Sequence, residues 1–253
     1  MDPSPSFPFR VDERPRPQAA ESVQKAAFRG AITGADAFPA TRAAVRLDGE
    51  LLRLGNRFVR WPKYREIAFI AAGNAAASQA LAVNESLGER LTQGLVAGPD
   101  SLPPEVPFRS VRVPRGYPGS REGEEAGRLA LELAQGLSEG DLLLLLLSPG
   151  AWTSLVAPPA GLAGAEFGRW LAELARRSSN SRLALLAAAA VGDGGSDGRL
   201  SEAPRGAEVV PIVVDRGDGA AVTGGSPARR LTDGERAEAL AGAEAIDLLG
   251  PLP

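Results

Sequence analysis

Two continuous apolar runs, Ile67–Ala72 and Leu142–Leu147, dominate the hydrophobic pattern of the chain. Neither run has the polar alternation of a half-exposed strand, so each predicts a central strand that is covered on both faces. Six consecutive leucines could also form a buried helix, but this run is short and lies between Gly140 and Pro149, which favours a strand. The β-branched residues of Val209–Val214 predict a third strand.

Helical patterns lie between these strands. Ala75–Leu87 follows the first run, and its alanines allow close packing on a sheet. Ser120 is placed to cap a helix with acidic residues in its first turn, where they suit the positive end of the helix dipole. The apolar positions of that helix recur at helical spacing, at Ala126, Leu129, Ala130, Leu133 and Leu137.

Weaker patterns complete the expected order of elements. The dipeptide Asp48-Gly49 predicts the turn of a hairpin over Val45–Leu54. The remaining expected elements are short strands at Leu95–Ala97 and Val111–Val113, helices over Ala19–Ala37, Ala165–Arg177 and Thr232–Ala241, and a segment over Leu183–Val191 that fits either a helix or a strand.

Strands that alternate with helices predict an α/β fold. We expect a three-layer, Rossmann-like arrangement in which a mainly parallel sheet carries helices on both faces. Residues 1–17 are rich in proline and charge, which predicts a flexible arm. Residues 18–253 are expected to form a single domain.

The carboxyl ends of parallel strands share one edge of a sheet, and ligands bind in the crevice at that edge. The residues that follow the three expected strands therefore define one candidate crevice for a phosphate or a nucleotide. These residues are Gly73 and Asn74, then Ser148, Pro149 and Gly150, and finally Asp215, Gly217 and Asp218. The sequence thus predicts where the site lies before it indicates any chemistry.

Composition removes several kinds of chemistry. The 253 residues contain neither cysteine nor histidine, which excludes disulfides, thiolate or imidazole metal ligands, a cysteine nucleophile and a Ser-His-Asp triad. A net charge of −3 argues against nucleic-acid binding, which needs a basic surface. The chain has neither a membrane-length apolar run nor the apolar core of a secretion signal, so we expect a cytoplasmic protein that makes no membrane contact. The many alanines, arginines, glycines and prolines are typical of a GC-rich bacterial genome.

Three motifs, Gly73-Asn74-Ala75, Gly116–Ser120 and Ser148–Leu155, carry a family resemblance. Their order resembles the N-terminal domain of the glycerate 2-kinase family of the MOFRL type. In that family a strand leads into a Gly-Lys-Ala turn, a Gly-His-Pro-x-Pro-Asp motif precedes a long helix, and a leucine-rich strand ends in Ser-Gly-Gly-x-Ser-Ala-Leu-Leu. The similar stretches of this chain are Leu54–Gly98, Gly116–Pro159 and, more faintly, Val209–Leu240.

The chain departs from the family pattern where the family handles phosphate. Asn74 replaces a lysine, so it can donate hydrogen bonds but supplies no positive charge to a transition state. Pro149 replaces a glycine and has no N–H to offer an anion. Trp152 is larger than the expected residue and could fill the pocket, unless it is an ordinary core aromatic. If Gly198–Leu200 matches a Lys-Gly-Gly-Arg-Leu-Ala segment of the family, Ala189–Val191 stand where an Arg-Lys-His cluster belongs.

Two further features concern the end of the chain. Asp215 and Asp218 resemble an acidic pair of the family, which could hold Mg²⁺ together with substrate phosphates, although a polar turn is the preferred interpretation. The resemblance implies a second domain that closes the catalytic cleft, and we expect this domain to be absent because the sequence stops at Pro253.

Together these departures predict a catalytically degenerate glycerate-kinase-like domain without catalytic residues, metal or cofactor. We expect a structural or regulatory subunit that binds a protein partner or associates with itself, with no nucleic-acid or membrane partner. The first alternative is an active or weakly active phosphotransferase on glycerate or a similar hydroxy acid, which would need Mg²⁺ and ATP. In that case Arg182, Arg199 or Arg216 would replace the lost cations. The second alternative is a sensor that binds an anion or a nucleotide at the helix N-terminus after Gly73.

Overall fold

The computed structural model describes residues 37–115, 120–158, 164–167, 169, 200, 203–214 and 221–222, with only the backbone of Trp152, Ala221 and Val222. The predicted arm over residues 1–17 and the expected elements at residues 19–36, 183–191 and 232–241 lie outside this part of the chain, as does most of the expected helix at 165–177. Those expectations remain predictions. Within the described residues, no helix combines the length and the apolar character that crossing a bilayer requires.

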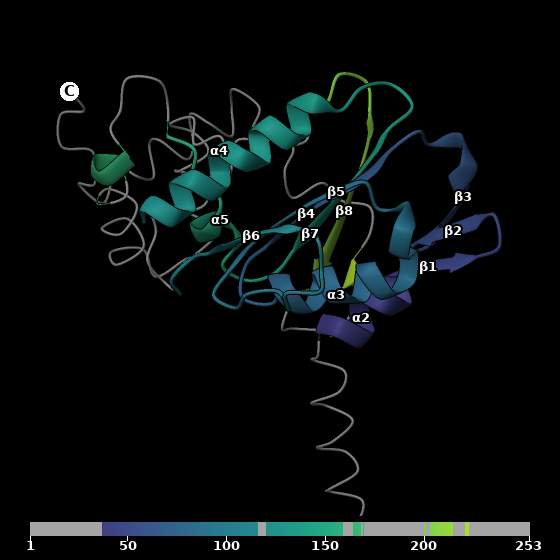
Figure 1. The fold of residues 1–253 in the computed structure, drawn as a ribbon, viewed down its shortest axis with the longest axis horizontal. Coiled ribbons are helices and arrows are strands. Elements are labelled where there is room, and N and C mark those ends of the chain that lie inside the picture. Colours follow the sequence, from purple (N-terminus) through teal and green to yellow (C-terminus); the bar gives the residue numbers. More distant parts are fainter. Residues whose placement is uncertain are drawn as a thin grey trace, which may run out of the picture.

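A six-stranded sheet forms the centre of the described structure, in the order β6-β5-β4-β7-β8-β9 (Figure 1). The strands from β6 to β8 pair in parallel, and the short β9 pairs antiparallel with β8 at one edge. The bounds of these strands are β4 (Ile67–Ala72), β5 (Gln93–Gly98), β6 (Arg109–Arg112), β7 (Leu142–Leu147), β8 (Glu208–Val214) and β9 (Ala221–Val222). The predicted mainly parallel sheet is therefore confirmed.

The two apolar runs form neighbouring strands at the middle of the sheet. β4 pairs with β7 on one side and with β5 on the other, so that Ile70 lies opposite both Leu145 and Leu95. Every residue of β4 is buried. Alternate side chains of these strands enter two different apolar clusters, one on each face of the sheet, which explains why both runs are continuously apolar.

Helices cover both faces of the sheet, as the sequence predicts. α4 (Arg121–Gly136) lies on one face, while α2 (Ala37–Ala44) and α3 (Ala76–Leu87) lie on the other (Figure 1). α4 contributes Ala126, Leu129, Ala130 and Ala134 to the apolar cluster on its face of the sheet, and α3 contributes Ala76, Ala80, Val83 and Leu87 to the cluster on the opposite face. The short helix α5 (Ala151–Ser154) follows β7, and two 3-10 turns occupy Trp61–Lys63 (η1) and Gly88–Arg90 (η2).

The start of α4 follows the capping prediction. The Ser120 hydroxyl accepts a hydrogen bond from the N–H of Gly123 at 3.0 Å, and Glu122 and Glu124 lie in the first turn. The hydroxyl therefore satisfies one of the donors that every helix N-terminus leaves unpaired.

A second, three-stranded sheet precedes β4 and differs in part from the prediction. Its strands are β1 (Val45–Asp48), β2 (Leu51–Leu54) and β3 (Arg57–Arg60), all antiparallel. The hairpin of β1 and β2 confirms the expected turn, but β3 is a strand that the sequence analysis missed. Its residues are Arg-Phe-Val-Arg, so neither face is consistently apolar and the usual strand alternation is lost.

The edge strand β6 is also offset from its prediction. The expected strand at Val111–Val113 instead spans Arg109–Arg112. Val113 lies just beyond the strand, although its N–H still donates to the carbonyl oxygen of Gly98 at 2.8 Å. Only Val111 of this strand is buried, so apolar character could not mark its beginning.

Candidate functional site

Two turns meet at the carboxyl ends of β4 and β7. Ala72 and Leu147 lie opposite each other at the ends of the paired strands, so Gly73-Asn74 and Ser148–Gly150 follow them as neighbouring turns. The structure therefore brings together five of the eight predicted crevice residues. The other three, Asp215, Gly217 and Asp218, lie outside the described residues, so their place in the crevice remains a prediction.

Gly73 allows these two turns to approach each other closely. Its φ is +105°, and a Cβ at this position would lie 2.4 Å from the carbonyl oxygen of Ser148 and 2.6 Å from its Oγ. A side chain here would have to displace backbone atoms as well as adopt a strained backbone conformation. The close approach is thus a direct consequence of the glycine.

The N–H groups of the first turn all donate inside the protein. Gly73 donates to the carbonyl of Ala97 at 3.0 Å, Asn74 to the carbonyl of Pro149 at 2.8 Å, and Ala76 to the carbonyl of Gly73 at 3.2 Å. The N–H of Ala75 donates to Ser148 Oγ at 3.0 Å. A phosphate-binding turn works by presenting free N–H groups to an anion, and none of these four is free.

Ser148 joins the two turns at a buried position. Its Oγ accepts from the N–H of Ala75 and donates to the carbonyl of Ala72 at 3.1 Å. Its own N–H donates to the same carbonyl at 3.0 Å. The hydroxyl is therefore fully engaged in holding the end of β4 against the end of β7.

The second turn is held mainly through its backbone carbonyls. The Pro149 carbonyl accepts from Asn74, and Gly150, at φ +90°, leads into α5. The Gly150 carbonyl accepts hydrogen bonds from the N–H groups and the hydroxyl groups of both Thr153 and Ser154. Pro149 thus contributes an acceptor to the contact between the turns, in a motif where the related family has a glycine.

The side chain of Asn74 faces the second turn. The position that a Cβ of Gly150 would occupy lies 3.5 Å from each of the Cγ, Oδ1 and Nδ2 atoms of Asn74. Equal distances to all three atoms place the plane of the amide across Gly150, and Asn74 is half-buried. The amide of Asn74 therefore faces the side of Gly150 on which a side chain would stand.

In the first turn of α3, the N–H groups of Ala77 and Ser78 make no hydrogen bond among the described residues. Every α-helix leaves donors unpaired at this end, so this feature alone indicates no ligand. Within the described part of the chain, no three acidic side chains gather as a metal site. Among the described crevice residues, the N–H groups of Gly73–Ala76 are therefore taken by protein acceptors, whereas those of Ala77 and Ser78 are not.

The opposite edge of the sheet carries a polar cluster that the sequence analysis missed. Glu208, the first residue of β8, pairs with Arg57 at 2.6 Å and Lys63 at 3.0 Å and accepts from the Tyr64 hydroxyl at 2.6 Å. Burial alone would raise the pKa of Glu208, but the hydrogen bonds from Tyr64 and Lys63 and the nearby positive charge hold it below its ordinary value. The partners lie about 150 residues apart in sequence, so no local pattern could have indicated the cluster.

Asp141 makes a related contact at the beginning of β7. Its Oδ2 accepts from Arg65 at 2.8 Å and from the N–H of Ser138 at 2.8 Å, and the carboxylate is buried. Burial would raise the pKa of Asp141, but the Ser138 N–H and the Arg65 guanidinium together lower it. Both acids connect β3 and the segment after it to the amino ends of the central strands. We therefore assign them a role in holding the fold together.

A family model described as "Domain of unknown function (DUF4147)" matches residues 23–181. The chain belongs to this family. The match covers more than half of the chain and contains both turns of the crevice. No curated protein matches the chain.

Two solved structures share the fold of this DUF4147 member. The PH0495 protein from Pyrococcus horikoshii OT3 has a TM-score of 0.72 and 15% identity, covering 92% of this chain and 52% of its own. The glycerate kinase from Thermotoga maritima has a TM-score of 0.62 and 20% identity, covering 88% of this chain and 52% of its own. The chain thus spans about half the length of each. The family match and the shared fold confirm the glycerate-kinase-like resemblance seen in the sequence.

Proposed function

We propose that this chain is a catalytically degenerate glycerate-kinase-like domain that acts as a structural or regulatory subunit by binding another protein. One observation carries the proposal. The four consecutive N–H groups of Gly73–Ala76 donate to protein acceptors, two of which belong to the Ser148–Gly150 turn. A phosphate could bind there only if the contact between the two turns opened.

The chemistry of the two turns supports the same proposal. Asn74 provides no charge in a position where the related family has a lysine, and each ~1.4 kcal/mol lost from transition-state stabilisation slows a reaction about tenfold. Pro149 has no N–H and uses its carbonyl to accept from Asn74. These residues replace an open, positively charged phosphate cradle with a closed and neutral contact.

The proposal is tested by assaying the full chain for transfer of phosphate from ATP to glycerate in the presence of Mg²⁺. We expect the wild type to form no more ADP than the matched Asn74→Ala variant forms under the same conditions. A contaminating kinase would act equally in both preparations, so it would not be mistaken for activity of this chain. Glycerate-dependent turnover that is present in the wild type and altered in the variant would overturn the proposal.

A second candidate function is an active or weakly active phosphotransferase. It is supported by the shared fold with a Thermotoga maritima protein named glycerate kinase. Such an enzyme would need Mg²⁺ and ATP, and a cation from Arg182, Arg199 or Arg216 in place of the lysine. The same assay decides between the two proposals when alanine variants of these three arginines are added as matched controls, because only this proposal predicts turnover that one of them reduces.

A further inference from the structure

The three-stranded sheet has one face toward the core and one toward solvent. Alternate residues of its strands point inward, where Val45, Leu52 and Leu54 are buried in the cluster beneath α3. The residues between them form the opposite side, which we call the outer face: Arg46, Asp48, Leu51, Arg53, Phe58 and Arg60, all of which are exposed. This face is available to a partner.

Two large apolar side chains are exposed on the outer face. Phe58 is 66% exposed and Leu51 is 48% exposed, and among the described residues these are the only large apolar side chains in that class. Both belong to one small sheet, on neighbouring strands. Burying them in an interface would remove their apolar surface from water, and aromatic residues are enriched at such interfaces.

Among the described residues, two arginines on the outer face have no carboxylate partner. Arg46 and Arg53 lie directly opposite each other on β1 and β2, an arrangement in which like charges repel. Other basic residues nearby are paired, with Arg42 bound to Glu85 at 3.2 Å, Arg57 bound to Glu208 and Arg60 bound to Glu50. Within the described part of the chain, neither Arg46 nor Arg53 makes an ion pair, although the Nε of Arg53 donates to the carbonyl of Gly55.

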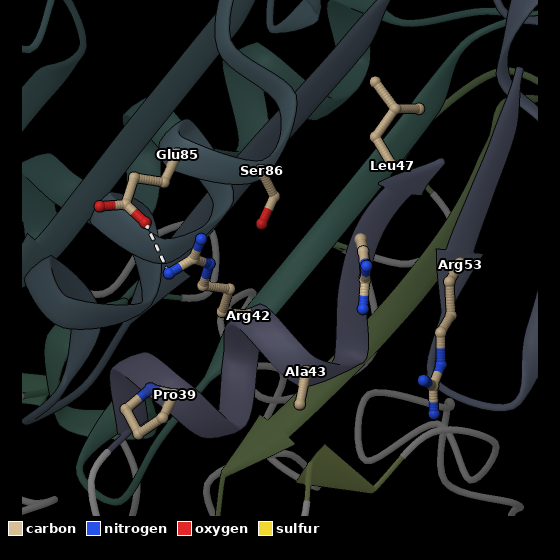
Figure 2. A pocket seen from close by; sticks show the side chains of 8 residues that line it. Pro39, Arg42, Ala43, Leu47, Arg53, Glu85 and Ser86 are labelled. Atoms are coloured by element: carbon tan, nitrogen blue, oxygen red, sulfur yellow. Dashed lines mark ion pairs between the residues drawn. The ribbon is translucent and has the colours of Figure 1, made fainter. Parts of the chain in front are cut away.

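These arginines join two hollows in the surface. A hollow of about 210 Å³ is lined by Arg46, Arg53, Leu51, Phe58 and Asp48. A larger groove of about 590 Å³ shares both arginines and continues toward α2 and the end of α3. Figure 2 shows Arg42 of this groove turned toward Glu85, with Arg53 on the other side. The positive charge of Arg46 and Arg53 is thus accessible from both hollows.

We propose that the outer face of the three-stranded sheet is a docking surface for a protein segment that combines carboxylates with a large apolar side chain. The carboxylates would pair with Arg46 and Arg53, and the apolar side chain would pack beside Phe58 and Leu51. Arginine forms bidentate pairs with carboxylates, so this contact supplies direction as well as attraction.

A second copy of the chain fits the surface poorly. A two-fold symmetric contact places the same patch of both copies together, which would bring Arg46 and Arg53 of both copies into one interface. The charge of the outer face therefore favours a different, acidic partner. This inference rests on the proposed function as a protein-binding subunit, for which it names the surface and the chemistry of the partner.

The test uses the full chain and short random peptides displayed on phage. We expect selection to enrich peptides that contain Asp or Glu beside Phe, Leu or Trp. Synthetic versions of these peptides should bind the wild type, and Arg46→Glu and Phe58→Ser should each weaken binding by about tenfold or more. The matched control is Arg121→Glu, which makes the same change in charge at an exposed position on α4 and should leave binding unchanged.

Several results would overturn the proposal. They are the failure of any peptide to be enriched, selected peptides without acidic residues, and binding that Arg46→Glu and Phe58→Ser leave intact. Self-association of the wild type that Arg46→Glu abolishes, measured by sedimentation, would assign the surface to a second copy instead. These failures are distinct from failure of the proposed function, which is decided by phosphate transfer to glycerate and does not involve the outer face.

Discussion

At the scale of single residues, the candidate site depends on the absence of a side chain at Gly73. Its missing side chain lets the carbonyl and hydroxyl of Ser148 come close enough for Ser148 and Pro149 to accept hydrogen bonds from Ala75 and Asn74. The contact between the turns is therefore built from a backbone position that other residues could not occupy without movement.

Replacing Gly73 with alanine should destabilise the protein by roughly 2–4 kcal/mol, because the new Cβ would meet the Ser148 carbonyl at a φ that L-residues rarely adopt. Urea unfolding of the full chain measures the change. Gly136→Ala is the matched control, since no atom lies within 4 Å of its Cβ position and it should be neutral or slightly stabilising. Equal stability of both variants would contradict the described geometry.

The Asn74→Lys variant restores the charge that the related family has. If the crevice were open, the added lysine should raise the affinity for Mg²⁺-ATP or inorganic phosphate. We expect no gain, because the neighbouring N–H groups donate to the protein and Gly150 lies under the side chain. A calorimetric comparison with the wild type measures this, and a clear increase in phosphate affinity would contradict the closed contact.

The identities of these residues could be read from the sequence, but their hydrogen bonds could not. The position of Gly73-Asn74 after a buried strand predicted a turn at the edge of a parallel sheet, which the structure confirms. That Ser148 would accept from Ala75 depends on the register between β4 and β7, whose residues are more than 70 positions apart. The hydrophobic pattern within one segment does not show which residues of a distant segment it contacts.

At the scale of elements, the best predictions concern strands and helices that are buried on a consistent pattern. β4 and β7 were recognised by their continuous apolar runs, α4 by apolar residues at helical spacing, and α3 by its alanines after the first strand. β3 was missed because arginines occupy both of its ends, one facing each side. Its place is secured by the ion pair of Arg57 with the distant Glu208 together with the packing of Val59 on the apolar cluster.

The acidic residues that bind these elements together should make stability depend on pH. The folded state lowers the pKa of both Asp141 and Glu208, so their contribution is complete above their unfolded pKa values of about 3.9 and 4.3. It is lost as the pH falls through the lower, folded pKa values. We therefore expect the free energy of unfolding to decrease below about pH 4, measured by urea unfolding at a series of pH values.

Variants separate this effect from general acid denaturation. Asp141→Asn should cost roughly 1–3 kcal/mol at neutral pH, because it weakens hydrogen bonds to a buried carboxylate. Its stability should also fall less steeply in acid than that of the wild type. Asp100→Asn, at an exposed pair with Arg115, is the control and should change little. An unchanged acid slope in Asp141→Asn would contradict the assignment.

At the scale of the whole molecule, the sequence indicated the fold and the family, but it did not indicate the function equally well. The order of motifs indicated a glycerate-kinase-like domain, and the family match and the six-stranded sheet confirm that relationship. The outer face was not predicted, because its exposed Phe58 and its two arginines without an ion pair in the described structure come together only when the three strands are assembled. A binding surface made of residues from three strands cannot be recognised in the sequence of any one strand.

The most direct test of the central claim is a calorimetric titration of the full chain with Mg²⁺-ATP and with ADP, each repeated in the presence of glycerate. The closed contact between the Gly73 and Ser148 turns predicts no saturable heat at millimolar nucleotide, with or without glycerate. Saturable binding in the micromolar range would contradict it, because a nucleotide phosphate would then have found donors that the structure assigns to the protein itself.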